Sequence, residues 1–137
     1  MAVTFNTDRL QGLNGVTING VYARIQAVGV KKFDAFGPYT FDSDGNETDT
    51  FDTDSPSYSA THWECSYEVV LHGSAAIRNA KGESPAWGNR LRSNEIERFS
   101  CTYDPTSNSN PYAQAYADLK TKLAAGGSPI ASSIADA

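Results

Sequence analysis

Two histidines are the side chains with which this chain could activate a nucleophile. His62 lies in a Thr-His-Trp sequence at the expected start of a strand, and His72 ends that strand just before Gly73. Nucleophilic catalysis needs a serine or cysteine within hydrogen-bonding reach of such an imidazole. Neither histidine has a glycine-framed serine or a reactive-looking cysteine beside it in the sequence. We therefore interpret both as structural strand-end residues, and the sequence predicts no catalytic residue and no enzyme.

A cluster of acidic residues offers the oxygen ligands that calcium and magnesium prefer. Four residues carry side-chain oxygen atoms spaced as at the start of a calcium loop: Asp42, Asp44, Asn46 and Glu47. An EF-hand is excluded, because Glu47 stands where its glycine is required and Thr53 replaces its final glutamate. An irregular cation site at these four residues stays open as an alternative. Apart from it, the sequence predicts no metal and no cofactor.

The two cysteines are expected to be structural. Cys65 and Cys101 both fall on the apolar side of segments in which polar and apolar residues alternate. Reduced, buried thiols that act as small hydrophobic side chains are the expected state. A disulfide between neighbouring strands stays open, because bond geometry cannot be read from spacing in a sequence.

Large aromatic residues in loops, with arginine nearby, are typical of protein–protein interfaces. Trp87 lies in a loop with Arg90 and Arg92 close by, and Tyr58 and Trp63 bracket a second loop. The sequence therefore predicts that these five residues bind a protein partner. The alternative for Trp87 is that its ring folds back and covers the sheet.

Composition argues against some classes of partner. The chain of 137 residues is long enough for one domain, and it carries eleven basic and sixteen acidic residues, net charge −5. That charge argues against nucleic acid and against an anionic membrane surface as partners. The N-terminus has no charged-then-apolar leader, so synthesis in the cytoplasm is expected. Six acids fall within residues 42–54, where they either complement a basic partner or aid solubility.

The element that the sequence specifies most completely is a helix over residues 110–126. Asn110 can cap its first turn, and Pro111 suits the first helical position. Spacings of three and four place five residues on one stripe: Tyr112, Ala115, Tyr116, Leu119 and Leu123. Gly126-Gly127 can end the helix, and residues 127–137 are expected to be an Ala/Ser-rich tail.

The residues before this helix are expected to be antiparallel strands and loops. After an N-terminal arm, residues 1–12, a β domain covers residues 13–109. An Asn19-Gly20 turn joins a strand at residues 16–18 to a return strand from Val21 to Val30, whose buried face includes Ala27. Backbone edges over residues 16–30 could add strands from other copies.

Two further strands and one long loop complete the expected domain. Residues 62–72 and 95–103 alternate between polar and apolar, as half-buried strands do. Residues 34–61 form an acidic loop or loose hairpin, with a strand at Tyr39-Thr40-Phe41. The predicted fold is one mainly β domain, an antiparallel β-sandwich or barrel-like structure, with one C-terminal amphipathic α-helix.

Two stretches of the chain resemble small proteins encoded among the structural genes of tailed bacteriophages. The first reads Gly-Val-Thr-Ile-Asn-Gly-Val-Tyr-Ala-Arg-Ile from Gly15 to Ile25, similar to an opening strand of that group. The second comprises Tyr103-Asp104, Asn110-Pro111 and the helix segment from Gln114 to Lys120. The chain departs from the group in its acidic loop, around Trp87 and in its tail.

That resemblance implies a non-enzymatic component of a phage virion, in the tail, baseplate or fibre-attachment region. Its partners would be other virion proteins and copies of itself, and it would be made and assembled in the host cytoplasm. Two other functions stay open: a decoration protein on the capsid, and a stand-alone β module that binds carbohydrate through Trp87 and Trp63. A symmetric oligomer that forms only inside virion particles would indicate a virion component. A monomer whose tryptophan fluorescence changes with sugar would indicate the carbohydrate module.

Overall fold

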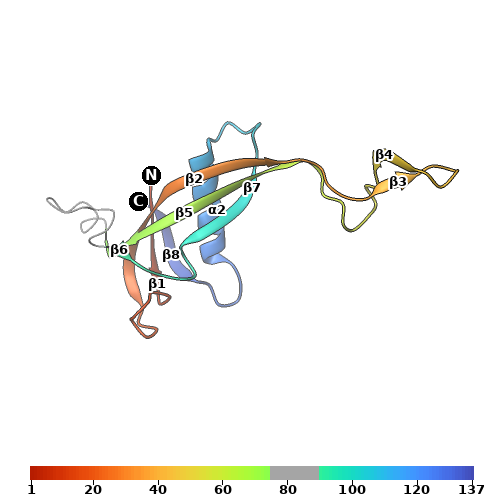
Figure 1. Ribbon diagram of the computed structural model, residues 1–137. Coiled ribbons are helices and arrows are strands. Elements are labelled where there is room, and N and C mark those ends of the chain that lie inside the picture. Colours follow the sequence, from red (N-terminus) through yellow and green to blue (C-terminus); the bar gives the residue numbers. More distant parts are fainter. Residues whose placement is uncertain (75–89) are drawn as a thin grey trace.

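The structure is a computed structural model of the chain, and it describes residues 1–74 and 90–137 (Figure 1). The strands are β1 (Val3–Thr7), β2 (Ile18–Phe33), β3 (Tyr39–Phe41), β4 (Glu47–Phe51), β5 (His62–His72), β6 (Arg90–Leu91), β7 (Arg98–Tyr103) and β8 (Ala131–Asp136). The helix α2 (Pro111–Ala124) lies between β7 and β8 in the sequence. The predicted fold class is confirmed, because the described residues form a mainly β, antiparallel structure with a helix near the C-terminus.

Six strands form one sheet in the order β6-β5-β2-β1-β8, and β7 also pairs with β5. Helix α2 packs against one face of this sheet (Figure 1). Strands β3 and β4 form a separate two-stranded sheet, which stands well away from the larger one (Figure 1). We call the six-stranded sheet with α2 the body, and residues 34–61 the distal hairpin. The distal hairpin thus extends the β2 and β5 ends of the body outward.

The predicted turn at Asn19-Gly20 is wrong, because β2 runs through both residues without a break. Its first partner is β1, in which Phe5 pairs with Val21 and Thr7 with Ile18. Strand β2 therefore has one more residue than β1 between these two pairs. Gly20 accommodates this bulge with a φ of +70°, a left-handed conformation that glycine adopts readily.

Both chain ends form strands of the body, so the predicted N-terminal arm and free tail are wrong. In β1, Val3 and Phe5 are buried in the core. The tail forms β8, which pairs antiparallel with β1, and the Ala137 amide donates to the Ala2 carbonyl at 3.0 Å. Local sequence signals do not reveal β8, because its pairing with β1 joins residues more than 120 positions apart.

The predicted helix is confirmed, with Asn110 as its cap and Pro111 in its first turn. The Asn110 side chain accepts a hydrogen bond from the Ala113 amide at 2.9 Å. The buried stripe contains four of the five predicted residues, Ala115, Tyr116, Leu119 and Leu123. The prediction is wrong for the fifth residue, Tyr112, which is 46% exposed. The helix contributes apolar burial, which is the main source of helix stability in proteins.

Two tyrosine hydroxyls fasten the sheet and helix together. The Tyr116 hydroxyl accepts from the Ile25 amide at 2.8 Å and donates to the Met1 carbonyl at 2.7 Å. From the sheet, the Tyr67 hydroxyl donates to the Asp118 carboxylate at 2.6 Å. Burial raises the pKa of Tyr67, and the Asp118 carboxylate raises it further, because a phenolate would lose its hydration and face a like charge. The hydroxyl therefore stays protonated as a hydrogen-bond donor.

A second bulge changes the buried face of β2 halfway along the strand. Ile25 pairs with Val69 and Ala27 with Glu68, so Gln26 is the extra residue. Val28 then packs on the core, whereas Ala27 is exposed, which contradicts the prediction that Ala27 shares the buried face. Strand β1 covers the first half of β2, but within the described residues no strand pairs with the β1-side edge beyond Ile25. The predicted open edge is therefore confined to the second half of β2.

Candidate interaction site

The structure keeps the two histidines far apart. They lie at the two ends of β5, ten residues and therefore about 33 Å from each other. His62 is partly exposed; its ring stacks on Phe33, and one ring nitrogen lies 2.9 Å from the Ala60 carbonyl. The Ala60 carbonyl and the Glu64 carboxylate raise the pKa of His62. His72 is buried in the sheet, so the two imidazoles cannot act on one substrate atom.

The weak cation candidates form the turn between β3 and β4. The Asp42 carboxylate accepts from the amides of Asp44, at 3.0 Å, and Asn46, at 2.9 Å. Gly45 completes the turn with a φ of +81°. Among the described residues, no three histidine, cysteine, aspartate or glutamate side chains gather where they could hold a metal ion. The local role of Asp42 is therefore to close this turn.

The residues predicted to bind a partner are not gathered at one surface. Trp87 lies outside the described residues. At one end of β5, Arg90 pairs with Glu68 at 3.5 Å, and Arg92 pairs with Glu97 at 3.2 Å. Trp63 is partly buried at the opposite end of β5. Tyr58 belongs to the distal hairpin, where it packs against another aromatic ring.

The distal hairpin has an ordered aromatic and hydrogen-bonded interior of its own. Tyr39 stacks on Phe51 with ring centroids 4.9 Å apart, and Tyr58 packs against Phe51 at 5.8 Å. At its base, Phe36 and Ser59 exchange two backbone hydrogen bonds of 2.9 and 2.8 Å. The predicted strand at Tyr39-Thr40-Phe41 is confirmed as β3. These contacts make the distal hairpin a small folded unit rather than a loose loop.

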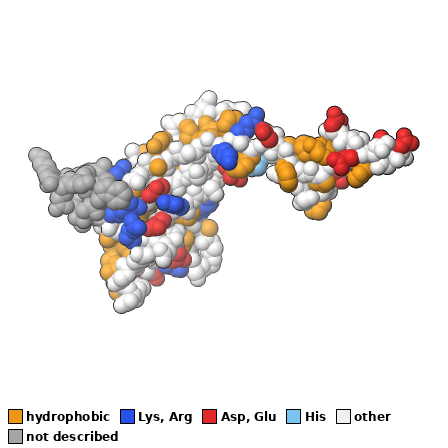
Figure 2. All heavy atoms as spheres, viewed as in Figure 1, with side chains coloured by type: hydrophobic (Ala, Val, Ile, Leu, Met, Phe, Trp, Pro, Cys, Tyr) orange, Lys and Arg blue, Asp and Glu red, His pale blue; other side chains and the backbone are white. Residues whose placement is uncertain are grey.

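Two phenylalanines on the distal hairpin remain outside this interior. Phe36 is 75% exposed and Phe41 is 67% exposed, both far more than a tightly packed aromatic residue would be. Seven acids lie in residues 34–61, and that segment contains no lysine or arginine. Figure 2 shows the same mixture of hydrophobic and acidic side chains on the distal hairpin. Exposed aromatic rings surrounded by polar residues are typical of a protein-binding surface.

The exposure of Phe36 and Phe41 was not predicted from the sequence. The acidic residues around them predict a charged loop, and an aromatic ring in such a loop can either fold inward or face solvent. Tyr39 and Phe51 take the inward position by stacking on each other. Tyr39 is still 39% exposed, but Phe51 covers one side of its ring, whereas no aromatic ring of the described residues packs on Phe41, which is 67% exposed. Sequence alone could not make that distinction.

We expect Gly37→Ala to disorder the distal hairpin while leaving the body folded. The added Cβ would lie 2.9 Å from the Tyr58 backbone, and Gly37 has a φ of +155°. The alanine would therefore push apart the two sides of the hairpin base. Hydrogen–deuterium exchange should show faster exchange of amides in residues 34–61 and unchanged protection in β5. Equal protection of both regions in the variant and the wild type would contradict this expectation.

The two cysteines face each other across the β5–β7 pairing, where Cys65 is opposite Cys101. Both are free thiols; Cys65 is buried and Cys101 is partly buried. Burial raises the pKa of both thiols, and that of Cys101 reaches about 11 because the Asp118 carboxylate adds a like charge. A raised thiol pKa lowers the fraction of the nucleophilic thiolate. These cysteines are thus placed for packing and not for nucleophilic reaction.

Alkylation of Cys101 is expected to be slow in the folded protein. A pKa of about 11 in place of 9.0 makes the thiolate fraction about a hundredfold smaller at mildly alkaline pH. Iodoacetamide labelling followed by mass spectrometry should therefore be at least that much slower in buffer than in concentrated urea. Equal labelling rates in the two solutions would show that the thiol is neither buried nor perturbed.

Comparisons with known proteins identify no relative. No family model matches the chain, no curated protein matches it, and no solved structure matches it. The resemblance to small phage structural proteins therefore remains a prediction. In the part of the chain that the structure describes, no helix is long and apolar enough to cross a bilayer.

Proposed function

We propose that this protein is a non-enzymatic structural subunit of a tailed bacteriophage virion, in the tail, baseplate or fibre-attachment region. The observation that carries the proposal is the distal hairpin, which presents Phe36 and Phe41 to solvent at the end of a projecting pair of strands. Maintaining two exposed aromatic rings costs solubility and favours aggregation. A subunit whose hairpin is covered by neighbours in an assembly avoids that cost.

The internal packing of the distal hairpin supports the same proposal. A segment that folds only on binding pays an ordering cost at that moment. The stacked rings of Tyr39 and Phe51 already hold the hairpin in one conformation in the free chain. A preformed projection of this kind is suited to repeated, identical contacts between subunits.

The two stretches that resemble phage structural proteins also contact each other. Ile25 ends the first stretch in β2, and Tyr116 lies within the second stretch in α2. Their backbone amide and side-chain hydroxyl are joined by the 2.8 Å hydrogen bond. The resemblance thus concerns one packing unit of the body, whereas the distal hairpin is one of the parts in which this chain departs from the group. We propose other virion proteins and further copies of the chain as its partners.

Analysis of purified phage particles tests this function. The chain should co-purify with particles through a density gradient, and electron microscopy should place many symmetric copies of it in the tail or baseplate. Copies attached to the head would instead identify a capsid decoration protein. Absence from particles would overturn the proposal. A monomer whose tryptophan fluorescence changes on addition of sugars would point to the carbohydrate-binding module.

A further inference from the structure

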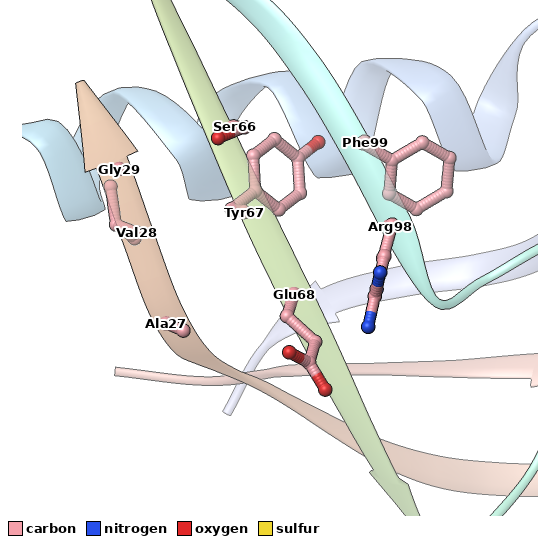
Figure 3. Close-up of a pocket in the computed structure, with 8 residues that line it drawn as sticks. All are labelled: Ala27, Val28, Gly29, Ser66, Tyr67, Glu68, Arg98 and Phe99. Atoms are coloured by element: carbon pink, nitrogen blue, oxygen red, sulfur yellow. The ribbon is translucent and has the colours of Figure 1, made fainter. Parts of the chain in front are cut away.

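The body contains a shallow hollow of about 410 Å³ over β2, β5 and β7 (Figure 3). Its lining includes the small residues Ala27, Gly29 and Ser66 together with Glu68 and Arg98. Ala27 pairs with Glu68, which pairs with Arg98, and Gly29 pairs with Ser66. Tyr67 lies between Ser66 and Glu68 in β5, and Phe99 follows Arg98 in β7, so both rings point to the other face of the sheet. On that face the Tyr67 hydroxyl reaches α2. The hollow therefore lies on the face of the sheet opposite the helix.

The size and lining of the hollow suit an aromatic ring. An enclosed cavity of about 150 Å³ already holds benzene, and this open hollow is larger. Gly29 and Ser66 leave the sheet backbone accessible, because neither side chain covers it. The adjoining edge of β2 has no partner strand among the described residues, so an approaching segment meets no obstacle there.

Positive side chains flank the hollow. Lys31 stands two residues beyond Gly29 on the same face of β2 and is exposed. Arg98 is exposed on β7, and within the described residues it forms no ion pair with an acid. Glu68, the acid beside it, is already paired with Arg90 at 3.5 Å. Lys31 already has Glu64 opposite it on β5 and lies 4.9 Å from the centroid of the Phe33 ring. Arg98 is thus the cation beside the hollow that most favours an acidic occupant.

The distal hairpin supplies that combination of aromatic ring and acidic charge. The distal hairpin carries seven acids and no lysine or arginine. The rest of the chain therefore carries nine acids and eleven basic residues, a net charge of +2. At the tip, Asp42 directly follows the exposed Phe41, and Asp44 lies two residues beyond Asp42. The hairpin points away from the body, so its tip lies far from the hollow of the same chain (Figure 1). Contact between the two must therefore join different molecules.

We propose that the distal hairpin of one copy binds in the hollow of the next copy, with Phe41 over Gly29 and Ser66. The acids of the tip then face Lys31 and Arg98. This inference rests on the proposed function and names a second copy of the chain as the partner. The two surfaces differ, so a contact made in one direction builds a ring or a filament, whereas two copies that exchange hairpins reciprocally close a two-fold dimer.

Photocrosslinking from the tip tests this contact directly. Phe41→benzoylphenylalanine places a photoreactive group there, and mixing unlabelled with ¹⁵N-labelled chains identifies links between different molecules. Irradiation should join the tip to residues 27–31 or 66–68 of the other isotope form, which line or flank the hollow. Links confined to one isotope form, links to other surfaces, or no links would each overturn the inference.

Two variants provide the control for this experiment. Arg98→Glu should lower the crosslink yield from position 41 about tenfold, because it places a like charge beside the acidic tip. Val16→benzoylphenylalanine puts the same probe at a body residue of similar exposure, 58%, and should give no link to the hollow. Equal yields from both positions would also overturn the inference. Presence of the chain in particles is measured separately, so a failed crosslink leaves the proposed function intact.

Discussion

Replacing residues 34–61 by Asn-Gly is expected to leave the body folded and to abolish assembly. Phe33 and His62 are directly opposite each other at the end of the β2–β5 pairing. A two-residue Asn-Gly turn closes such a pair in the conformation that antiparallel strands favour. The core residues of the body come from the strands of its sheet, from α2 and from the loops that contain Leu10 and Ile96, and none lies in the replaced segment. The thermal midpoint should therefore change by only a few degrees.

The loss of assembly follows from what the replacement removes. It deletes Phe36, Phe41 and all seven acids of the distal hairpin, and it changes the net charge from −5 to +2. Sedimentation of the purified variant, and its incorporation into particles, would measure the effect. A matched variant, Phe41→Ser, keeps the charge and the hairpin and should weaken assembly in the same direction. Normal incorporation of the shortened chain would mean that the subunits join through the body.

Sequence predicted the elements whose signals are local. Asn110 and Pro111 begin α2 because capping and a missing amide act within one turn. In strand β5 the burial alternates from Glu64 to Val69, where Cys65 and Tyr67 are buried, whereas its last four residues, 69–72, are all buried. In both cases the sequence period and the burial of one face agree, so the tertiary structure does not override the local preference.

Elements that depend on distant partners could not be predicted in the same way. Strand β8 consists mostly of alanine and serine, which favour strands weakly, and it forms because β1 offers it hydrogen bonds. The Asn19-Gly20 pair has a strong preference for hairpin turns, but a neighbouring strand can use the same left-handed glycine as a bulge. Strand register decides between these outcomes, and register is set by the whole sheet.

The candidate site was predicted by region but not by residue. Composition marked residues 34–61 as an unusual acidic segment, and length suggested a functional role. The sequence predicts Tyr58 as a binding residue, yet its ring packs against Phe51 inside the hairpin. The exposed rings are those of Phe36 and Phe41. Which of several nearby aromatic residues pack together depends on the pairing of β3 with β4, and so it follows only from the three-dimensional structure.

Leu119→Ala is expected to lower the free energy of unfolding by about 2–5 kcal/mol, the usual range for removing a buried leucine side chain. Leu119 is fully buried where α2 meets the core of the sheet. Small domains have about 5–15 kcal/mol of stability in total, so this one change could remove a large share of it. Urea denaturation of the wild type and the variant would give the difference, provided that the slopes of the two curves agree.

Tyr112→Ala is the matched control for this prediction, because Tyr112 lies on the same helix with a side chain that is 46% exposed. It should cost less than about 1 kcal/mol, since nearly half of Tyr112 stays in water in the folded state and its removal leaves no enclosed cavity. If Leu119→Ala cost no more than Tyr112→Ala, α2 would not hold the body together through its buried stripe. The helix would then be free to leave the sheet, and its apolar face would have to be counted among the surfaces that bind other subunits.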